Sequence, residues 1–128
     1  MRQGRNVIVF ENKPSIVAWS AVAGTKEGEG PLGELFDMVL DESEMPSESW
    51  ELSESSFHKT SLGVLLNKAG LNESDIDVIF AGDLLNQCSA SSYGLLDFDI
   101  PYYGLYGACS TAAEGMMLSA MEKAKSLG

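Results

Sequence analysis

Strand-like and helix-like segments alternate along this chain of 128 residues. Apolar, strand-like runs at 16–23, 77–81 and 100–106 are each followed by a helix-like segment, at 50–69, 89–96 and 110–125. This order predicts an α/β fold, with helices layered around a mostly parallel sheet. The length is sufficient for one domain with its own hydrophobic core.

The segment Trp50–Ala69 gives the clearest helical pattern in the first half of the chain. Its apolar stripe consists of Leu62, Leu65, Leu66 and Ala69. Gly70 follows at the position where a left-handed residue commonly ends a helix. Asn72 and Asp75 then have the spacing of a capping box. The apolar run Asp77–Ala81 that follows suits a strand covered on both faces.

The flanking segments give weaker patterns. Val7–Phe10 and Ile16–Ala23 predict a hairpin-like start, with Pro14 between the two strands. Leu32 to Val39 has helical spacing, which predicts one to three helical turns. Asp41–Ser49 is acidic, contains a proline and is expected to form an exposed loop. Ser110–Lys125 is rich in Ala and Met, which predicts a buried helix.

The chain is strongly acidic, with 19 Asp and Glu residues against 8 Lys and Arg and a net charge of -11. This balance argues against a nucleic-acid partner, because phosphate binding relies on clustered Lys and Arg. The acidic residues gather between Glu27 and Glu54, where a solvated surface is the ordinary interpretation. No calcium-binding loop motif accompanies them, so no metal site is predicted there.

Cys88 and Cys109 are the two cysteines. They are too few for a disulfide scaffold, and their spacing is not that of a zinc site. The first residues lack the apolar segment of a signal peptide, and no apolar run is long enough to span a bilayer. A cytoplasmic type of compartment is therefore expected. The one histidine, His58, falls within the predicted helix 50–69 and is interpreted as a surface residue rather than a catalytic base.

The stretch Gly107-Ala108-Cys109-Ser110-Thr111 lies between a predicted strand and a predicted helix. A cysteine at a helix N-terminus is favoured as thiolate by the unpaired N–H groups and the helix dipole. Gly107 permits a tight turn, as in a nucleophile elbow, although Thr111 stands where that motif has glycine. A reactive or ligand-facing Cys109 and an inert core thiol both remain open on this motif alone.

The stretch from Ala81 to Gln87 (AGDLLNQ) follows the predicted strand 77–81 directly. Its polar residues include Asp83 and Asn86. Ligands of open α/β sheets bind beyond the carboxyl ends of the strands, which makes these side chains candidates. The alternative is that Asp83 or Asn86 caps the following helix.

Three stretches together carry a family resemblance: GEGPLGELFD at 28–37, DVIFAGDLLNQ at 77–87 and IPYYGLYGACSTAAEGMMLS at 100–119. They resemble the amino-terminal half of the stage V sporulation protein AD family, whose fold is similar to that of thiolases and ketoacyl synthases. The resemblance implies a role in sporulation and spore germination, with binding of dipicolinic acid and its movement into the developing spore. Cys109 matches the position of the condensing-enzyme nucleophile, and Asp83, Asn86 and Ser110 are then expected to line the ligand pocket.

The resemblance also implies what lies outside residues 1–128, which correspond to the amino-terminal part of a thiolase-like domain. The family is more than twice as long and closes its fold with a second α/β half. That half supplies the catalytic partners of the cysteine in condensing enzymes, so catalysis by this chain alone is not expected. No cofactor is expected.

Several partners follow from the same resemblance. They are dipicolinic acid, either free or as its calcium chelate, and the membrane-complex proteins of sporulation stage V, with a peripheral location at the spore inner membrane. A homodimer is also expected, because the apolar helix 110–125 would otherwise lack a covering layer.

Two further hypotheses stand beside the sporulation interpretation. The first is half of a condensing-type acyltransferase, with Cys109 as the acylated nucleophile. The second is a non-catalytic structural module in which Cys109 is an inert thiol. Labelling of Cys109 by acyl-CoA distinguishes the first hypothesis, and rapid alkylation of Cys109 at neutral pH argues against the second.

Overall fold

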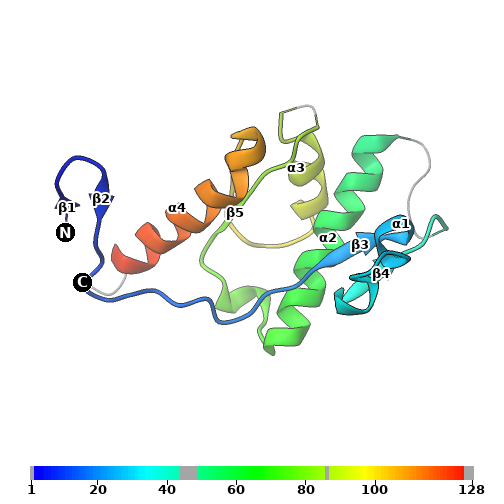
Figure 1. The fold of residues 1–128 in the computed structure, drawn as a ribbon, viewed down its shortest axis with the longest axis horizontal. Coiled ribbons are helices and arrows are strands. Elements are labelled where there is room, and N and C mark those ends of the chain that lie inside the picture. The colour runs from blue at the N-terminus through cyan, green and yellow to red at the C-terminus, as the bar shows by residue number, and fades with distance from the viewer. Residues whose placement is uncertain (1, 44–48, 86, 126–128) are drawn as a thin grey trace.

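The computed structural model of the chain describes residues 2–43, 49–85 and 87–125. Its strands are β1 (Arg2–Gln3), β2 (Val7–Ile8), β3 (Val22–Gly24), β4 (Met38–Leu40), β5 (Ile79–Ala81) and β6 (Tyr102–Gly104). Its α-helices are α1 (Thr25–Gly28), α2 (Trp50–Ala69), α3 (Ser89–Leu95) and α4 (Thr111–Lys125). Three 3₁₀ helices, η1 (Gly33–Leu35), η2 (Glu73–Asp75) and η3 (Ala108–Ser110), complete the described elements (Figure 1).

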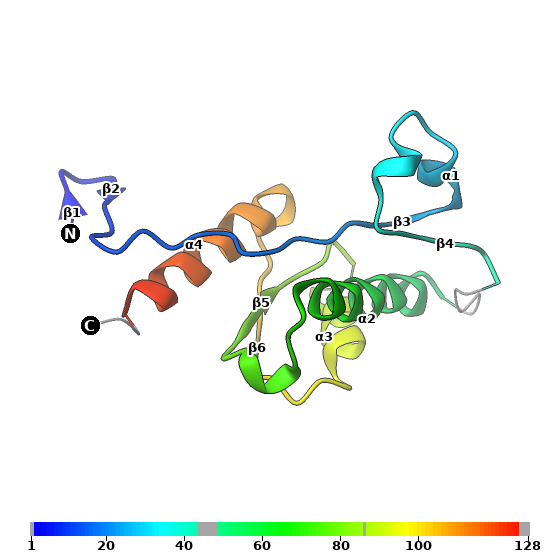
Figure 2. The ribbon, with the colours of Figure 1, turned by 90° about the horizontal axis from the view of Figure 1, so that it is seen from below.

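The described strands form three separate two-stranded sheets. β1 and β2 pair antiparallel, whereas β3 pairs with β4 and β5 pairs with β6 in parallel. Helices pack against the parallel pairs, so the predicted α/β class is confirmed. The described parallel pairing is divided between two short sheets, and the stretch before β3 runs alongside the molecule without pairing to β5 (Figure 2).

Helix α2 begins and ends where its sequence predicts. The Ser49 hydroxyl accepts the backbone N–H of Leu52 at 3.2 Å and caps the N-terminus. Gly70 adopts the left-handed conformation, with φ of 66°, and the N–H of Leu71 donates to the carbonyl of Leu66 at 3.0 Å. These bonds satisfy carbonyls that would otherwise lack partners at the end of the helix.

The capping box after α2 is also confirmed. The side chain of Asn72 accepts the backbone N–H of Asp75, and the Asp75 carboxylate accepts the N–H of Asn72 at 2.8 Å. The turn that results is η2, a short 3₁₀ helix rather than the start of an α-helix. It directs the chain into β5.

The tightest packing in the described chain lies between α2 and α3. Ser55, Ala90, Ser91, Gly94 and Leu95 are buried there. The Ser55 hydroxyl lies 2.9 Å from the carbonyl oxygen of Ala90. A Cβ added to Gly94 would stand only 2.4 Å from the Ser55 carbonyl oxygen, so glycine is what permits the helices to approach.

His58 belongs to the same contact. Its Cβ would lie 2.9 Å from a Cβ added to Gly94. Its side chain is 20% exposed, with Nε2 at 3.9 Å from the Glu54 carboxylate. The prediction of a surface helix residue is therefore wrong in part, because the His58 Cβ lies against Gly94 of α3 and only 20% of the side chain is exposed.

The amino-terminal predictions need three corrections. Val7–Phe10 contributes only the two residues of β2, which pair with β1 through a turn at Gly4, and not with Ile16–Ala23. Ile16–Ala23 is strand only at Val22–Gly24, where β4 supplies a partner. Leu32–Val39 contains only η1 before entering β4, because extended backbone at Phe36 ends the turn.

Helix α4 differs most from its prediction. It was expected to be buried, yet Met116 is 62% exposed and Met117 is 55% exposed. Only one side of the helix is covered, where Gly115 lies against the backbone of Phe80 in β5. None of the helices formed by the described residues is both long enough and apolar enough to cross a membrane.

Candidate functional site

The two sequence stretches with candidate chemistry meet at one edge of the β5–β6 sheet. Because β5 and β6 are parallel, the loops that follow them leave from the same edge. The N–H of Leu105 donates to the carbonyl of Ala81 at 2.8 Å, which continues the pairing into both loops. A Cβ added to Gly82 would lie 1.9 Å from the Leu105 oxygen and 2.9 Å from Cγ2 of Thr111. Only glycine therefore allows this approach.

The cysteine-bearing turn is held by hydrogen bonds within Gly107–Thr111. The N–H of Gly107 donates to the Thr111 hydroxyl at 3.1 Å, and the N–H of Ser110 donates to the Gly107 carbonyl at 3.0 Å. Ala108 has a positive φ of 49°, unusual for a residue with a side chain. Cys109 follows within η3, immediately before α4, and is exposed with a free thiol.

Glu114 belongs to this turn, although the sequence interpretation passed over it. The Ser110 hydroxyl donates to the Gly107 carbonyl at 2.6 Å and lies 3.3 Å from Oε1 of Glu114. A Cβ added to Gly107 would be 2.5 Å from both carboxylate oxygens of Glu114. The spacing Thr111-x-x-Glu114 before an apolar run is a capping-box signature that could have identified it.

This carboxylate changes the electrostatics predicted for the turn. A negative charge in the first turn of a helix stabilises that helix through its dipole. The same charge disfavours a second anion nearby. The turn is therefore less attractive to an anionic ligand than its sequence motif alone indicates.

Asp83 is 5% exposed and uses both carboxylate oxygens internally. Oδ1 accepts the N–H of Leu85 at 2.9 Å, and Oδ2 accepts the N–H of Ser91 at 2.6 Å. The hydroxyl of Ser91 lies in turn 2.9 Å from that of Tyr102 on β6. Asp83 thus caps α3, as one of the two sequence interpretations held, and fixes the loop beside the cysteine turn. Asn86 lies outside the described residues.

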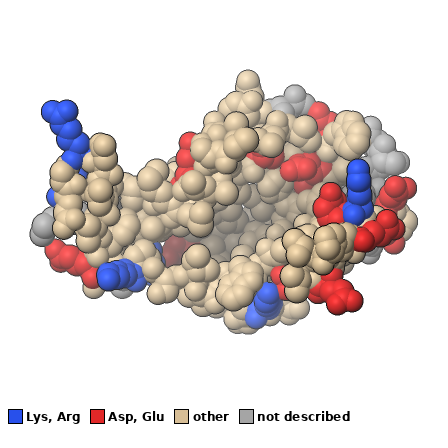
Figure 3. All heavy atoms as spheres, in the orientation of Figure 1, with Lys and Arg blue, Asp and Glu red and all other residues tan. Residues whose placement is uncertain are grey.

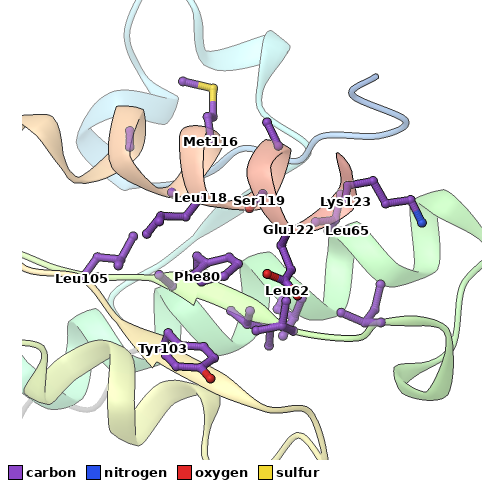
Figure 4. Close-up of a pocket in the computed structure, with 18 of the residues that line it drawn as sticks. Leu62, Leu65, Phe80, Tyr103, Leu105, Met116, Leu118, Ser119, Glu122 and Lys123 are labelled. Atoms are coloured by element: carbon purple, nitrogen blue, oxygen red, sulfur yellow. The ribbon is translucent and has the colours of Figure 1, made fainter. Parts of the chain in front are cut away.

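An open cleft of about 1710 Å³ runs along this edge of the molecule, and both Asp83 and Cys109 line it. The hollow is visible in Figure 3, and its interior is drawn in Figure 4. Leu62 and Leu65 of α2 lie on one side and Leu118 of α4 on the other. Between them the rings of Phe80 and Tyr103 stack with centroids 5.5 Å apart. The lining is predominantly apolar.

The groups that a cysteine enzyme needs are not gathered here among the described residues. His58 lies at the α2–α3 contact and is not part of the cleft lining. Cys88 is half-buried on the neighbouring loop, where its thiol lies 3.0 Å from the Leu105 carbonyl oxygen. The described residues contain no group of three or more His, Cys, Asp or Glu side chains arranged to hold a metal ion.

Fold and site together define an α/β segment whose cysteine-bearing strand-to-helix turn borders an apolar cleft. Residues 4–126 match the family Stage V sporulation protein AD (SpoVAD), and the chain belongs to that family, as its sequence predicts. It is 40% identical over 111 residues to Stage V sporulation protein AD of Bacillus subtilis (strain 168). The matched region covers 87% of this chain and 33% of that relative, so the chain spans about a third of the relative's length.

Proposed function

We propose that the protein binds dipicolinic acid and supports its uptake into the developing spore. Membership of the stage V sporulation protein AD family supports the sporulation role. The observation that supports a ligand site is the contact between two loops at the edge of the cleft. Gly82 meets Thr111 there, and Cys109 and Asp83 line the same cavity.

The cleft suits an aromatic acid in two respects. Its apolar floor, including Phe80 and Tyr103, offers rings on which a pyridine ring stacks. The backbone at the start of α4 offers N–H donors to a carboxylate. In this proposal Cys109 and Ser110 lie beside the ligand, and Asp83 acts by holding the neighbouring loop. Asn86 remains a proposed contact from that same loop.

Charge favours the calcium chelate over the free dianion as the bound form. The Glu114 carboxylate already lies against Gly107 and Ser110 in the first turn of α4. A second, doubly negative group is repelled by it, whereas a chelate carries its own compensating cation. The ligand is thus expected to bind more tightly when calcium is present.

Two protein partners are part of the proposal. The membrane-complex proteins of sporulation stage V are expected to receive the ligand at the spore inner membrane, where this protein would be peripheral. A second copy is expected to cover the apolar side of α4, where Met116 and Met117 are exposed. Such a contact is symmetric and closes as a dimer.

The proposal is tested by titrating dipicolinate into this chain in a calorimeter with and without calcium. Saturable heat is expected, with a lower Kd in calcium. Benzene-1,3-dicarboxylate is the matched ligand control, because it keeps the ring and both carboxylates but lacks the chelating nitrogen. It is expected to give no calcium dependence.

Variants locate the binding site. Cys109→Ala and Ser110→Ala are expected to weaken binding, since both side chains lie on the cleft-side turn. Cys88→Ala is the matched control, because this half-buried thiol is not among the residues lining the cleft. No heat from the folded protein, or equal loss in the control, would reject the ligand site.

Acyl transfer is the second candidate function, favoured by the exposed thiol of Cys109 beside an apolar cleft. A thioester would form by attack of the thiolate on an acyl-CoA carbonyl, with release of the CoA thiol. Incubation with acyl-CoA followed by mass spectrometry tests this directly. An added acyl mass on Cys109 supports acyl transfer. An unmodified protein argues against acyl transfer and in favour of ligand binding.

A further inference from the structure

The amino-terminal hairpin stands away from the body of the molecule. β1 and β2 pair only with each other, and both views show them at one end of the long axis, beyond α4 (Figures 1 and 2). Val7 is 51% exposed and Ile8 is 48% exposed. An isolated two-stranded hairpin is marginally stable in water, so a surface that covers its apolar residues would stabilise this one.

This hairpin and the stretch after it are basic in an acidic protein. Residues 2–13 contain Arg2, Arg5 and Lys13 against Glu11 alone, a net charge of about +2. All four side chains are exposed. The stretch continues with Ile16 and Val17, which are 74% and 85% exposed. We refer to residues 2–17 as the basic arm.

The opposite end of the molecule carries the complementary combination. Around α1, η1 and β4, six acidic residues are exposed beside the single exposed Lys26: Glu27, Glu29, Glu34, Asp37, Asp41 and Glu42. Figure 3 shows acidic residues gathered at this end, on the right, and basic residues at the hairpin on the left. Between the acids lie Leu32, 60% exposed, and Leu35, 76% exposed. We refer to residues 27–42 as the acidic end.

The basic arm does not contact the acidic end of its own molecule in this structure. The chain between them is already extended, and the two surfaces lie at opposite ends of the longest dimension in both views. Opposite charge steers association and fixes its register, while exposed apolar side chains supply the burial that stabilises it. The two surfaces of one chain carry both opposite charges and exposed apolar side chains.

We propose that the basic arm of one copy docks on the acidic end of a second copy. Val7 and Ile8 would pack against Leu32 and Leu35, with arginines beside glutamates. The contact joins two different surfaces, so each copy keeps one arm and one acidic end free for further copies. The assembly is therefore an open, head-to-tail chain, unlike a closed dimer formed through α4.

The test is sedimentation velocity of this 128-residue chain over a range of protein concentrations, in 50 mM and 500 mM NaCl. The mean mass is expected to rise with concentration past that of a dimer at low salt. Association is expected to weaken about tenfold at high salt, because surface charge pairs are screened. Association through the apolar side of α4 alone would not weaken at high salt.

Charge reversal identifies the surfaces. Arg2→Glu with Arg5→Glu should abolish association, and so should Glu27→Lys with Glu29→Lys, whereas an equal mixture of the two variants should restore it. The control Lys59→Glu with Lys123→Glu adds the same charge as the arm variant, but outside both surfaces. Circular dichroism checks that each variant is folded.

Three outcomes overturn the proposal. They are a single mass at all concentrations, an arm variant that associates like the parent chain, and a mixture that fails to regain association. A hairpin that binds phosphatidylglycerol vesicles without any self-association would replace the second copy by an anionic membrane surface.

Discussion

Replacing Gly94 by alanine should destabilise the protein because the new methyl group has no room. Its Cβ would lie 2.4 Å from the Ser55 carbonyl oxygen and 3.1 Å from the Ser55 carbonyl carbon. These are backbone atoms of α2, so relief requires the two helices to separate. Separation also stretches the 2.9 Å contact between the Ser55 hydroxyl and the Ala90 carbonyl.

The magnitude follows from three terms. Overpacking a tight contact costs about 1–3 kcal/mol. A weakened buried hydrogen bond costs about 1 kcal/mol more. Alanine is a better helix former than glycine, which offsets roughly 1 kcal/mol of this cost. The free energy of unfolding is therefore expected to fall by about 2 kcal/mol. At a slope near 2 kcal/mol per M, this lowers the urea midpoint by about 1 M.

Gly63→Ala is the matched control for this prediction. Gly63 also lies in a helix interior, within α2, but a Cβ added there meets no atom within 4 Å. Only the better helix propensity of alanine remains, so the free energy of unfolding of this variant should rise by up to about 1 kcal/mol. Urea unfolding followed by far-UV circular dichroism compares the two variants. If Gly94→Ala unfolds at the same urea concentration as Gly63→Ala, the close α2–α3 contact is refuted.

Three further predictions concern the charged residues. The Lys68 ammonium holds the pKa of Asp37 below its ordinary value, so the stabilisation from this carboxylate is present above about pH 4 and lost as pH falls through the lowered pKa. The urea midpoint of the parent chain should exceed that of Asp37→Asn at pH 6 and converge with it in acid. Asp83→Asn should lower the midpoint by about 1 M, with faster amide exchange at the start of α3, since hydrogen bonds to charged groups contribute roughly 1.5–3 kcal/mol. Glu114→Gln should speed iodoacetate alkylation of Cys109 about two- to fivefold, because a charge in the first helical turn is worth about 0.3–1 kcal/mol; an unchanged rate would mean that the carboxylate has no influence on the thiol.

The parts of the fold that were predicted have local determinants. Helix α2 follows from the stripe at Leu62, Leu65 and Leu66, and its end follows from Gly70, which takes the left-handed conformation with little strain. The capping box at Asn72 and Asp75 is likewise closed within four residues. Each of these depends only on side chains near in sequence, so periodicity and spacing suffice.

The parts that were missed depend on partners far along the chain. Ile16–Ala23 has strand composition throughout, but only Val22–Gly24 finds β4 beside it. The small-residue contact at Gly94 leaves no periodic signal, because its meaning comes from Ser55, 39 positions earlier. Helix α4 was expected to be buried on composition, and composition does not specify which elements are present to cover it.

The sequence predicted the candidate site to about the same extent as the fold. The family resemblance, and not the strand-edge rule, implied that the loop of Asp83 lies beside the cysteine turn, and the structure brings Gly82 of that loop against Thr111. The resemblance does not specify where the carboxylate points, and both oxygens accept backbone N–H groups. Glu114 was missed although its spacing from Thr111 is that of a capping box, and that spacing does not show that its carboxylate lies against Gly107.

The edge of the site and the walls of the cleft are built in different ways. Gly82 packs on the backbone of Leu105 and the side chain of Thr111, and Asp83 ties its loop to α3, so the described part of the edge is held by contacts within this chain. The apolar walls, by contrast, remain open to solvent between α2 and α4. If the edge supplies the ligand's polar contacts, dipicolinate binding by this chain should depend on calcium and should weaken in the Cys109→Ala variant. A lower Kd in Stage V sporulation protein AD of Bacillus subtilis, of which this chain spans about a third, would then measure what the rest of that relative adds.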